Sequence, residues 1–229
     1  FLPALAIVIA HEIPAGPPPT TITSVLLLFS SFSIINHPIC LHKNYTSNFI
    51  HCKIANMIIT AGKFKGQKVQ VPDENITRPT LSKVRMSIFN TLQAMLDFEG
   101  SSFLDMYAGS GIMGLEALSR GFSKVVAFEK HPKVAQVIKS NFRRFNPAPK
   151  LIFGDSLKSA SKMSEKFDVI YIDPPYFSGI YEKSLEAIRT ISFGIVILEH
   201  VVDVDFGDFE VIKQKKYGDK FVTFLKLSK

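Results

Sequence analysis

The 229-residue sequence contains no tryptophan, only two cysteines and, over its first 56 residues, almost no charge. Two cysteines, Cys40 and Cys52, cannot build the disulfide framework of a small secreted domain. With the histidines around them they lack the tight spacing of zinc ligands, so we expect no metal site. Hydrophobic residues make up 46% and charged residues 21% of the chain, which excludes disorder over most of its length.

Charge divides the sequence in two. Residues 1–56 hold three charged side chains, whereas 57–229 hold 25 of the 27 Lys and Arg and 19 of the 20 Asp and Glu. The apolar run 21–35 is shorter than the roughly 20 residues that span a membrane, and no basic residue precedes it as in a signal peptide. We expect Met57 to be the true start and residues 1–56 to be a disordered, upstream-translated extension. A degenerate targeting or membrane segment and a genuine small extension are the alternatives.

From Met57 onward, strand-like and helix-like segments alternate. Two β-like runs, 57–61 and 67–71, flank a Gly-Lys-Phe-Lys-Gly turn and indicate a hairpin with a basic tip, and 81–96 has helical spacing. The later expected strands are 103–107, 124–129, 151–153, 167–172, 193–199, 209–213 and 221–227, and the expected helices are 112–120, 132–145, 156–163 and 181–190. The pattern predicts an α/β fold: a mostly parallel seven-stranded sheet with helices on both faces and an antiparallel C-terminal strand.

A glycine-rich turn follows the first strand of this sheet. Gly109, Gly111 and Gly114 match G-x-G-x-x-G, where glycine lets the backbone turn sharply and approach a nucleotide. Glu129, at the end of the next strand, can accept hydrogen bonds from two ribose hydroxyls. These features indicate a nucleotide site and leave open a nicotinamide cofactor or S-adenosylmethionine. Asp105 favours a cationic ligand, because a carboxylate would repel a pyrophosphate.

A second motif, Asp173-Pro174-Pro175-Tyr176, follows the apolar strand 167–172, at the carboxyl end where open α/β sheets bind ligands. The prolines fix a rigid loop and lack N–H donors, which leaves carbonyls free to accept. The Asp173 carboxylate and a carbonyl can accept both hydrogens of an exocyclic amine, and Tyr176 can stack on the ring that carries the amine. The motif predicts a site for a flat aromatic amine.

Together these motifs resemble class I S-adenosylmethionine-dependent methyltransferases with a Rossmann-like fold, which act on exocyclic amines of nucleic-acid bases. More specifically, 57–229 resembles the RsmD family, the bacterial 16S rRNA guanine-N2 methyltransferases. The likeness is carried by Ile58–Gly66, Arg78-Pro79-Thr80, Val84-Arg85, Phe89-Asn90, Gly114–Gly121, Glu129-Lys130, Asp173–Tyr176 and Glu199-His200. Met86 departs from the pattern, which has an acidic residue after the arginine.

The resemblance implies roles for individual residues. It makes Asp173, Pro174 and Tyr176 catalytic, and it assigns the S-adenosylmethionine site to Asp105, Tyr107, Gly109, Gly111, Glu129 and Asp155. It assigns substrate binding to Lys63, Lys65, Arg78, Thr80 and Pro175. For Asp155 the alternative is a helix N-cap. Glu199 and His200 have no assigned step, and a polar brace under the active-site loop is the working interpretation.

Charge suggests an organisation and the resemblance a partner. Residues 57–85 hold six basic residues, Lys63, Lys65, Lys68, Arg78, Lys83 and Arg85, against Asp73 and Glu74. This excess favours an RNA-docking role for 57–99, with a merely soluble face as the alternative, and 100–229 would be the methyltransferase domain. Lys139, Arg143 and Arg144 are expected to be ordinary solvent-facing charges. The expected partner is 16S rRNA in an assembled or assembling 30S subunit, bound by a cytoplasmic monomer without membrane contact. The rival hypotheses are a DNA adenine-N6 methyltransferase, a nicotinamide-dependent oxidoreductase and an inactive RNA-binding module.

Overall fold

The computed structural model describes residues 56–72, 82–175 and 179–228. The expected extension, apart from Asn56, lies outside these ranges, and so do the candidate site residues Arg78, Thr80 and Tyr176.

The described residues form two sheets. The first is an antiparallel hairpin of β1 (Asn56–Ile58) and β2 (Lys68–Gln70), which is followed by α1 (Ser82–Gln93). The second consists of β3 (Ser102–Asp105), β4 (Lys124–Glu129), β5 (Lys150–Phe153), β6 (Phe167–Ile172), β7 (Phe193–His200), β8 (Phe209–Tyr217) and β9 (Lys220–Leu227). Between its strands lie α2 (Ile112–Arg120), α3 (Pro132–Phe142), α4 (Ser156–Ala160), α5 (Ile180–Ala187) and the 3-10 helix η2 (Ile188–Thr190).

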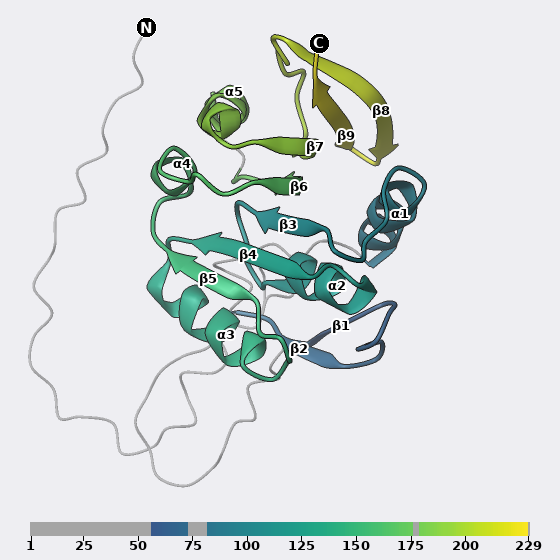
Figure 1. The fold of residues 1–229 in the computed structure, drawn as a ribbon, viewed down its shortest axis with the longest axis vertical. Coiled ribbons are helices and arrows are strands. Elements are labelled where there is room, and N and C mark those ends of the chain that lie inside the picture. The colour runs from purple at the N-terminus through teal and green to yellow at the C-terminus, as the bar shows by residue number, and fades with distance from the viewer. Residues whose placement is uncertain (1–55, 73–81, 176–178, 229) are drawn as a thin grey trace, which may run out of the picture. The chain divides into compact units, whose positions relative to one another are not determined.

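The strands of the large sheet follow the order β5-β4-β3-β6-β7-β9-β8 (Figure 1). Strands β3 to β7 are parallel, whereas β9 runs antiparallel to both of its neighbours, β7 and β8. The predicted α/β fold, with seven strands and an antiparallel C-terminal strand, is therefore confirmed. After β5 the chain returns to the other side of β3, so β3 and β6 flank the point where the strand order reverses. Open α/β sheets bind ligands at the carboxyl ends of strands at such a point.

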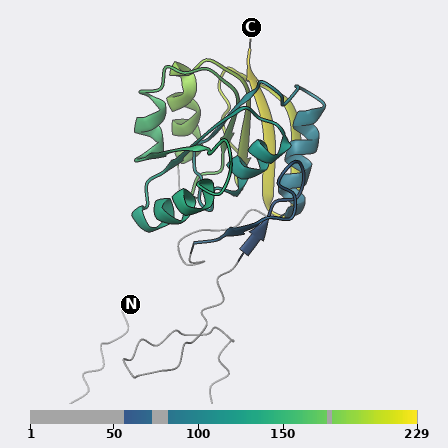
Figure 2. The ribbon, with the colours of Figure 1, turned by 60° about the horizontal axis from the view of Figure 1, so that its bottom comes forward.

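Successive side chains of each central strand point to opposite faces of the sheet, and apolar side chains on both faces are covered by helices. Phe103, Val169 and Tyr171 point to the face covered by α1, α2 and α3. Leu104, Ile170 and other residues one position away point to the face covered by α4 and α5. Figure 2 shows the helices on the two sides of the sheet. This two-sided burial holds the carboxyl ends of β3, β4 and β6 in fixed positions.

Some predicted boundaries differ from the structure. Strand β8 extends to Tyr217, beyond the predicted Lys213. The prediction stopped short because β8 is an edge strand, and its mostly exposed side chains do not show the apolar alternation by which a strand is predicted. Helices α3 and α4 end at Phe142 and Ala160, short of the predicted Phe145 and Met163. Within the three described ranges, none of the helices has the length and apolar character needed to cross a membrane.

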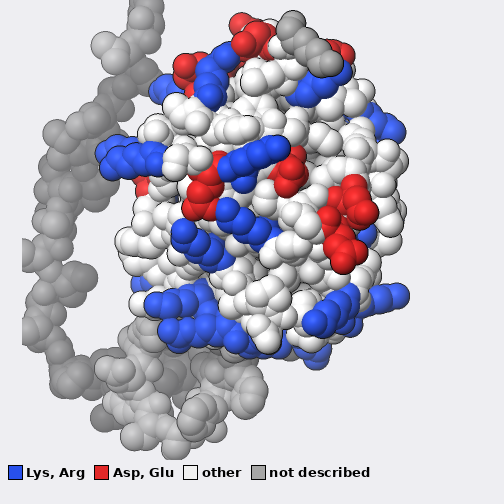
Figure 3. Space-filling view, viewed as in Figure 1, with Lys and Arg blue, Asp and Glu red and all other residues white. Residues whose placement is uncertain are grey.

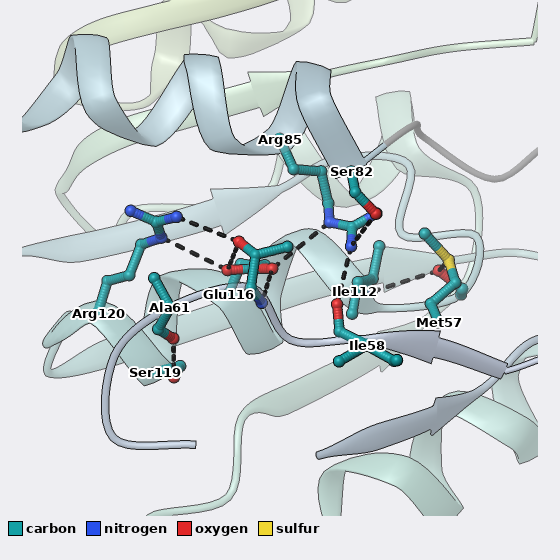
Figure 4. A network of polar contacts seen from close by, with 11 residues as sticks. Met57, Ile58, Ala61, Ser82, Arg85, Ile112, Glu116, Ser119 and Arg120 are labelled. Carbon is teal, nitrogen blue, oxygen red and sulfur yellow. Dashed lines mark hydrogen bonds and ion pairs between the residues drawn. The ribbon is translucent and has the colours of Figure 1, made fainter. Parts of the chain in front are cut away.

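The hairpin is attached to α2 through polar groups (Figure 4). The Lys63 N–H donates to the Ser119 carbonyl at 2.7 Å, and the Thr60 N–H donates to the Glu116 carboxylate at 2.6 Å. Gly62 has a φ of +79°, and a Cβ there would lie 1.8 Å from the Ser119 oxygen, so the close approach requires glycine.

Arg85 completes this network from α1. Its guanidinium is fully buried, lies 3.5 Å from Glu116 and donates to the Ile58 carbonyl at 2.9 Å. The assignment of Arg85 to an RNA-docking surface is therefore wrong: counting charges along the sequence cannot reveal that one of them is buried against a carboxylate of another helix.

Candidate active site

A pocket of about 430 Å³ opens at the carboxyl edge of the sheet, between β3, β4 and β6. Such a volume is typical of sites for small ligands. The pocket brings together most of the predicted cofactor residues with part of the predicted catalytic motif. Its lining includes Asp105, Tyr107, Gly109, Glu129, Asp173, Pro174 and Pro175. The structure thus brings these residues to one pocket.

The glycine-rich turn holds one side of the pocket in place. The Gly109 N–H donates to one Glu129 oxygen at 3.2 Å, and the His131 N–H donates to the other at 2.7 Å. Gly111 has a φ of +76°, and a Cβ there would lie 2.8 Å from the Phe142 ring, so the turn packs directly against α3. Two backbone donors thus fix the Glu129 carboxylate at the end of β4, where it lines the pocket.

Asp105 is a buried carboxylate with an unused oxygen. One oxygen accepts from the Tyr107 N–H at 3.3 Å, whereas Oδ2 has no partner among the described residues. Burial, together with the nearby Asp173, Glu129 and Glu199, raises the pKa of Asp105 to about 8. A buried acceptor without a donor, surrounded by further carboxylates, suits a cationic ligand and disfavours a phosphate.

The two remaining predicted cofactor residues have partners of their own. The Tyr107 hydroxyl lies 2.8 Å from Ser184 Oγ, and because Ser184 donates to the Ile180 carbonyl, Tyr107 is the donor to Ser184. Burial raises the pKa of the Tyr107 phenol. The Asp155 carboxylate accepts from the Lys158 N–H at 3.0 Å as the N-cap of α4. Asp155 is not among the residues that line the pocket, although its neighbour Ser156 is.

Asp173 begins the loop after β6 and takes part in a chain of polar contacts. Lys220 Nζ lies 3.4 Å from both Asp173 oxygens and 2.5 Å from Glu199 Oε2. The buried Tyr171 hydroxyl donates to the other Glu199 oxygen. Pro174 is buried and Pro175 exposed, so the second proline faces outward at the rim.

Sequence reasoning missed Lys220 and, for Glu199, offered only a polar brace under the active-site loop. The pairing of β9 beside β7 brings them together, with Glu199 opposite Val222. No spacing motif could have revealed this contact, since it depends on the insertion of β9 between β7 and β8. His200 is engaged elsewhere: Nδ1 donates to the Val202 carbonyl and Nε2 contacts the Thr223 hydroxyl.

Two of the predicted substrate residues lie apart from the pocket. Lys63 and Lys65 are exposed in the loop of the hairpin and are not part of the pocket lining. The structure therefore does not bring them into the pocket with Asp173.

Comparison with known proteins decides the family. The profile of a family described as "Conserved hypothetical protein 95" matches residues 57–226. Ribosomal RNA small subunit methyltransferase D of Buchnera aphidicola is 32% identical over 147 residues, which cover 62% of this chain and 75% of the relative. This chain belongs to the RsmD family.

Other RsmD-like proteins agree with this assignment. The Bacillus subtilis protein YlbH, named provisionally as an rRNA methyltransferase, is 32% identical over 179 residues, which cover 71% of this chain and 94% of YlbH. An Escherichia coli structure, titled provisionally as a methyltransferase, superposes with a TM-score of 0.68 over 76% of this chain and 98% of its own length. At 22% identity that structure supports the shared fold alone. The resemblance of 57–229 to the RsmD family is thus confirmed.

Proposed function

We propose that this RsmD-family protein transfers a methyl group from S-adenosylmethionine to the exocyclic N2 amine of a guanine in 16S rRNA. The observation that carries the proposal is that Asp105, Glu129, Asp173 and Pro174 line one and the same pocket. Ribosomal RNA small subunit methyltransferase D is also the name of relatives across 61% or more of this chain. A ribosomal substrate implies action in the cytoplasm.

The chain's own carboxylates fit S-adenosylmethionine. The unpaired Asp105 Oδ2 would accept from the ligand's amino group, and Glu129, already fixed by two backbone donors, would accept from the ribose hydroxyls. Tyr107 and the backbone of Gly109 and Gly111 would line the remainder of that side, with Asp155 near the adenine. When bound, this ligand supplies a sulfonium methyl: the new N–C bond forms as the S–C bond breaks, and sulfur keeps the electron pair of that bond.

Asp173 and Pro174 would position the nucleophile. The Asp173 carboxylate and the Pro174 carbonyl would each accept one hydrogen of the guanine amine and so direct the nitrogen toward the methyl group. Once the nitrogen is methylated it is acidic, and Asp173 can take its extra proton without being a strong base. We assign stacking on the base to Tyr176, which lies outside the described residues. Because the methyl donor already carries a good leaving group, holding the two reactants in line would supply most of the rate acceleration. To reach the site, the guanine must be unstacked or flipped out.

We infer that RNA docks on a basic surface formed by the hairpin and α3, which we call the basic ridge. Its members are exposed: Lys63, Lys65, Lys68, Lys139, Arg143 and Arg144. In Figure 3, Lys and Arg gather along the lower edge of this face, over α3 and the hairpin, whereas Asp and Glu lie higher on it. Such a surface suits the phosphates of RNA.

The ridge is continuous because α3 holds the hairpin. Asn141 exchanges two hydrogen bonds with the Gln70 backbone, at 2.8 and 3.1 Å, and Arg144 donates to the Lys68 carbonyl at 2.9 Å. Phe64 packs edge-on against Phe145, with 5.0 Å between the ring centres. This placement gives Lys139, Arg143 and Arg144 a role in the proposal beyond the solvent-facing one expected from the sequence. Arg78 and Thr80, in the segment between β2 and α1, are proposed to close over the base or the cofactor.

The test is methylation with radiolabelled S-adenosylmethionine. The full chain is incubated with 30S subunits that lack the modification, with free 16S rRNA and with duplex DNA, and nucleosides are identified after digestion. We expect label in N2-methylguanine of 30S subunits, less in free rRNA, and loss of label with Asp173→Ala. Cofactor binding, followed by calorimetry, should survive that substitution. Label in adenine, or in DNA with blank rRNA, would overturn the proposal. Light scattering of the free protein should give the mass of a monomer.

A further inference from the structure

Lys220 connects two carboxylates that differ in burial. Its ammonium lies 2.5 Å from Glu199 and 3.4 Å from both oxygens of Asp173. Glu199 is fully buried, whereas about a fifth of the Lys220 and Asp173 side chains is exposed to the pocket. Lys220 therefore has one anchor inside the protein and one partner at the site.

The anchor fixes where the ammonium lies. A buried carboxylate requires hydrogen bonds and an opposite charge, and Glu199 receives both, from the Tyr171 hydroxyl and from Lys220. Tyr171 remains a neutral donor, because burial and the surrounding carboxylates hold its pKa well above the usual value. The first residue of β9 is thus held against Glu199 at a point from which it also reaches Asp173.

Several titratable groups lie in the same region as Asp173. Asp105 on β3 and Glu129 on β4 line the same pocket, and Glu199 on β7 shares the Lys220 ammonium with Asp173. Lys130 and His131 also line the pocket, after β4. Of these described groups, Lys220 is the cation for which an ion pair with Asp173 is observed. Lys220 is therefore the described cation that offsets the negative charge of ionised Asp173.

We propose that Lys220 is a positioning residue for methyl transfer, whose ammonium keeps Asp173 ionised and holds its carboxylate toward the incoming amine. The role in transfer rests on the proposed function, whereas the effect on Asp173 does not. Lys220 exchanges no atom with the substrates: the proton of the methylated amine goes to Asp173, and Lys220 stabilises the carboxylate before that step.

The effect on Asp173 is measured directly by carboxyl ¹³C NMR, with Asp173→Asn to assign the resonance. Removing an opposite charge at this distance should raise the titration midpoint of Asp173 by about one pH unit or more in Lys220→Met. Lys220→Arg should stay near the wild-type midpoint. Lys226→Met is the matched control: Lys226 lies on the same strand and pairs with the exposed Glu210 at 3.2 Å, so its loss should leave Asp173 unchanged. An unchanged midpoint in Lys220→Met would overturn the proposal.

A second pair of variants guards against misfolding, since Lys220→Met leaves Glu199 buried without its cation. Glu199→Gln keeps a hydrogen-bonding partner for Tyr171 and removes that charge. Comparison of Glu199→Gln with Glu199→Gln/Lys220→Met isolates the lysine, and equal Asp173 midpoints in the two would again refute its role.

Activity provides the independent readout. With S-adenosylmethionine saturating, the acid limb of kcat/KM for 30S subunits should move to higher pH in Lys220→Met and return with Lys220→Arg. A merely structural lysine would lower kcat/KM equally at all pH values. If the wild-type protein methylates no 30S subunits, the proposed function fails, and the NMR result still decides whether Lys220 controls Asp173.

Discussion

The Arg85 guanidinium, on α1, lies 3.5 Å from the Glu116 carboxylate, on α2, and both side chains are fully buried. Glu116 also accepts from Thr60 of the hairpin and pairs with Arg120 at 3.4 Å. One carboxylate therefore joins α1, α2 and the hairpin, three elements that are separate along the chain. Burial lowers the pKa of the Arg85 guanidinium, and the neighbouring Glu116 carboxylate opposes this shift. Glu116 thus supplies to the buried Arg85 charge the stabilisation that water would supply at the surface.

Glu116→Gln should destabilise the protein by about 3–5 kcal/mol, because it removes the carboxylate charge that lies beside the buried Arg85 guanidinium. Arg85→Met should cost less, since Glu116 keeps Thr60 and Arg120. The double variant should be more stable than the sum of the single effects implies. Urea unfolding measures all three, with Lys83→Met, an exposed site on the same helix, as a control expected within about 0.5 kcal/mol of wild type. Additive single effects would show that the two side chains are not coupled.

Gly62 and Gly66 form a matched pair for testing the hairpin contact. Both have positive φ, +79° and +86°, but a Cβ at Gly62 would lie 1.8 Å from the Ser119 oxygen, whereas nothing lies within 4 Å at Gly66. Gly66→Ala should cost about 1–2 kcal/mol for the left-handed conformation alone. Gly62→Ala should cost clearly more, because the hairpin must also move away from α2. Equal free energies of unfolding would contradict the observed approach.

The sequence predicts elements best where burial produces a regular pattern. The limits of α2, β4 and β6 match the expected 112–120, 124–129 and 167–172, because these segments are apolar through most of their length and are bounded by glycine, charge or proline. Edge strand β8 was too short in the prediction because nothing buries most of its side chains. Regular hydrophobic spacing thus predicts the elements of the core and does not predict where an edge strand ends.

The site was predictable to the extent that topology alone assembles it. Asp105, Glu129 and Asp173 each end or follow a parallel strand, so they meet at one edge of the sheet whatever the details of packing. Lys220 and the buried state of Arg85 depend on how β9 and the hairpin dock, and local sequence does not encode that geometry. Both cases concern a cation whose partner lies far away in the chain.

Asp105 should make both stability and cofactor binding depend on pH. Its pKa is about 8 in the folded protein, above the ordinary 3.8, so the folded state binds an extra proton between these values. Stability from this group is therefore present at low pH and is lost as pH rises toward 8. Asp105→Asn should therefore stabilise the ligand-free protein more at pH 8 than at pH 5. The gain in the free energy of unfolding should reach up to several kcal/mol at pH 8, and it is measured as a rise in Tm at each pH. A larger gain at pH 5 would reverse the assignment.

The same carboxylate should favour its cation only when ionised. The affinity for S-adenosylmethionine should rise with pH toward about 8 in the wild-type protein, as Asp105 loses its proton. In Asp105→Asn this rise should disappear and the affinity should fall about tenfold or more, consistent with a charge-assisted hydrogen bond of roughly 1.5–3 kcal/mol. Calorimetry across pH tests this, and a rise that persists in Asp105→Asn would assign it to another group.

The basic ridge should govern affinity for RNA and not the chemical step. Lys139→Glu/Arg143→Glu should raise KM for 30S subunits about tenfold or more and leave kcat within about twofold. Lys139 on α3 and Arg143 directly after it do not line the pocket that holds Asp173, and they are proposed to contact phosphates. The dependence of binding on salt should weaken by roughly one unit of slope for each lost phosphate contact. Lys162→Glu/Lys183→Glu removes two exposed lysines next to α4 and on α5, on the other face of the sheet, with the same change in net charge. If that control raises KM equally, net charge and not the ridge controls binding; if neither variant changes KM, RNA docks elsewhere.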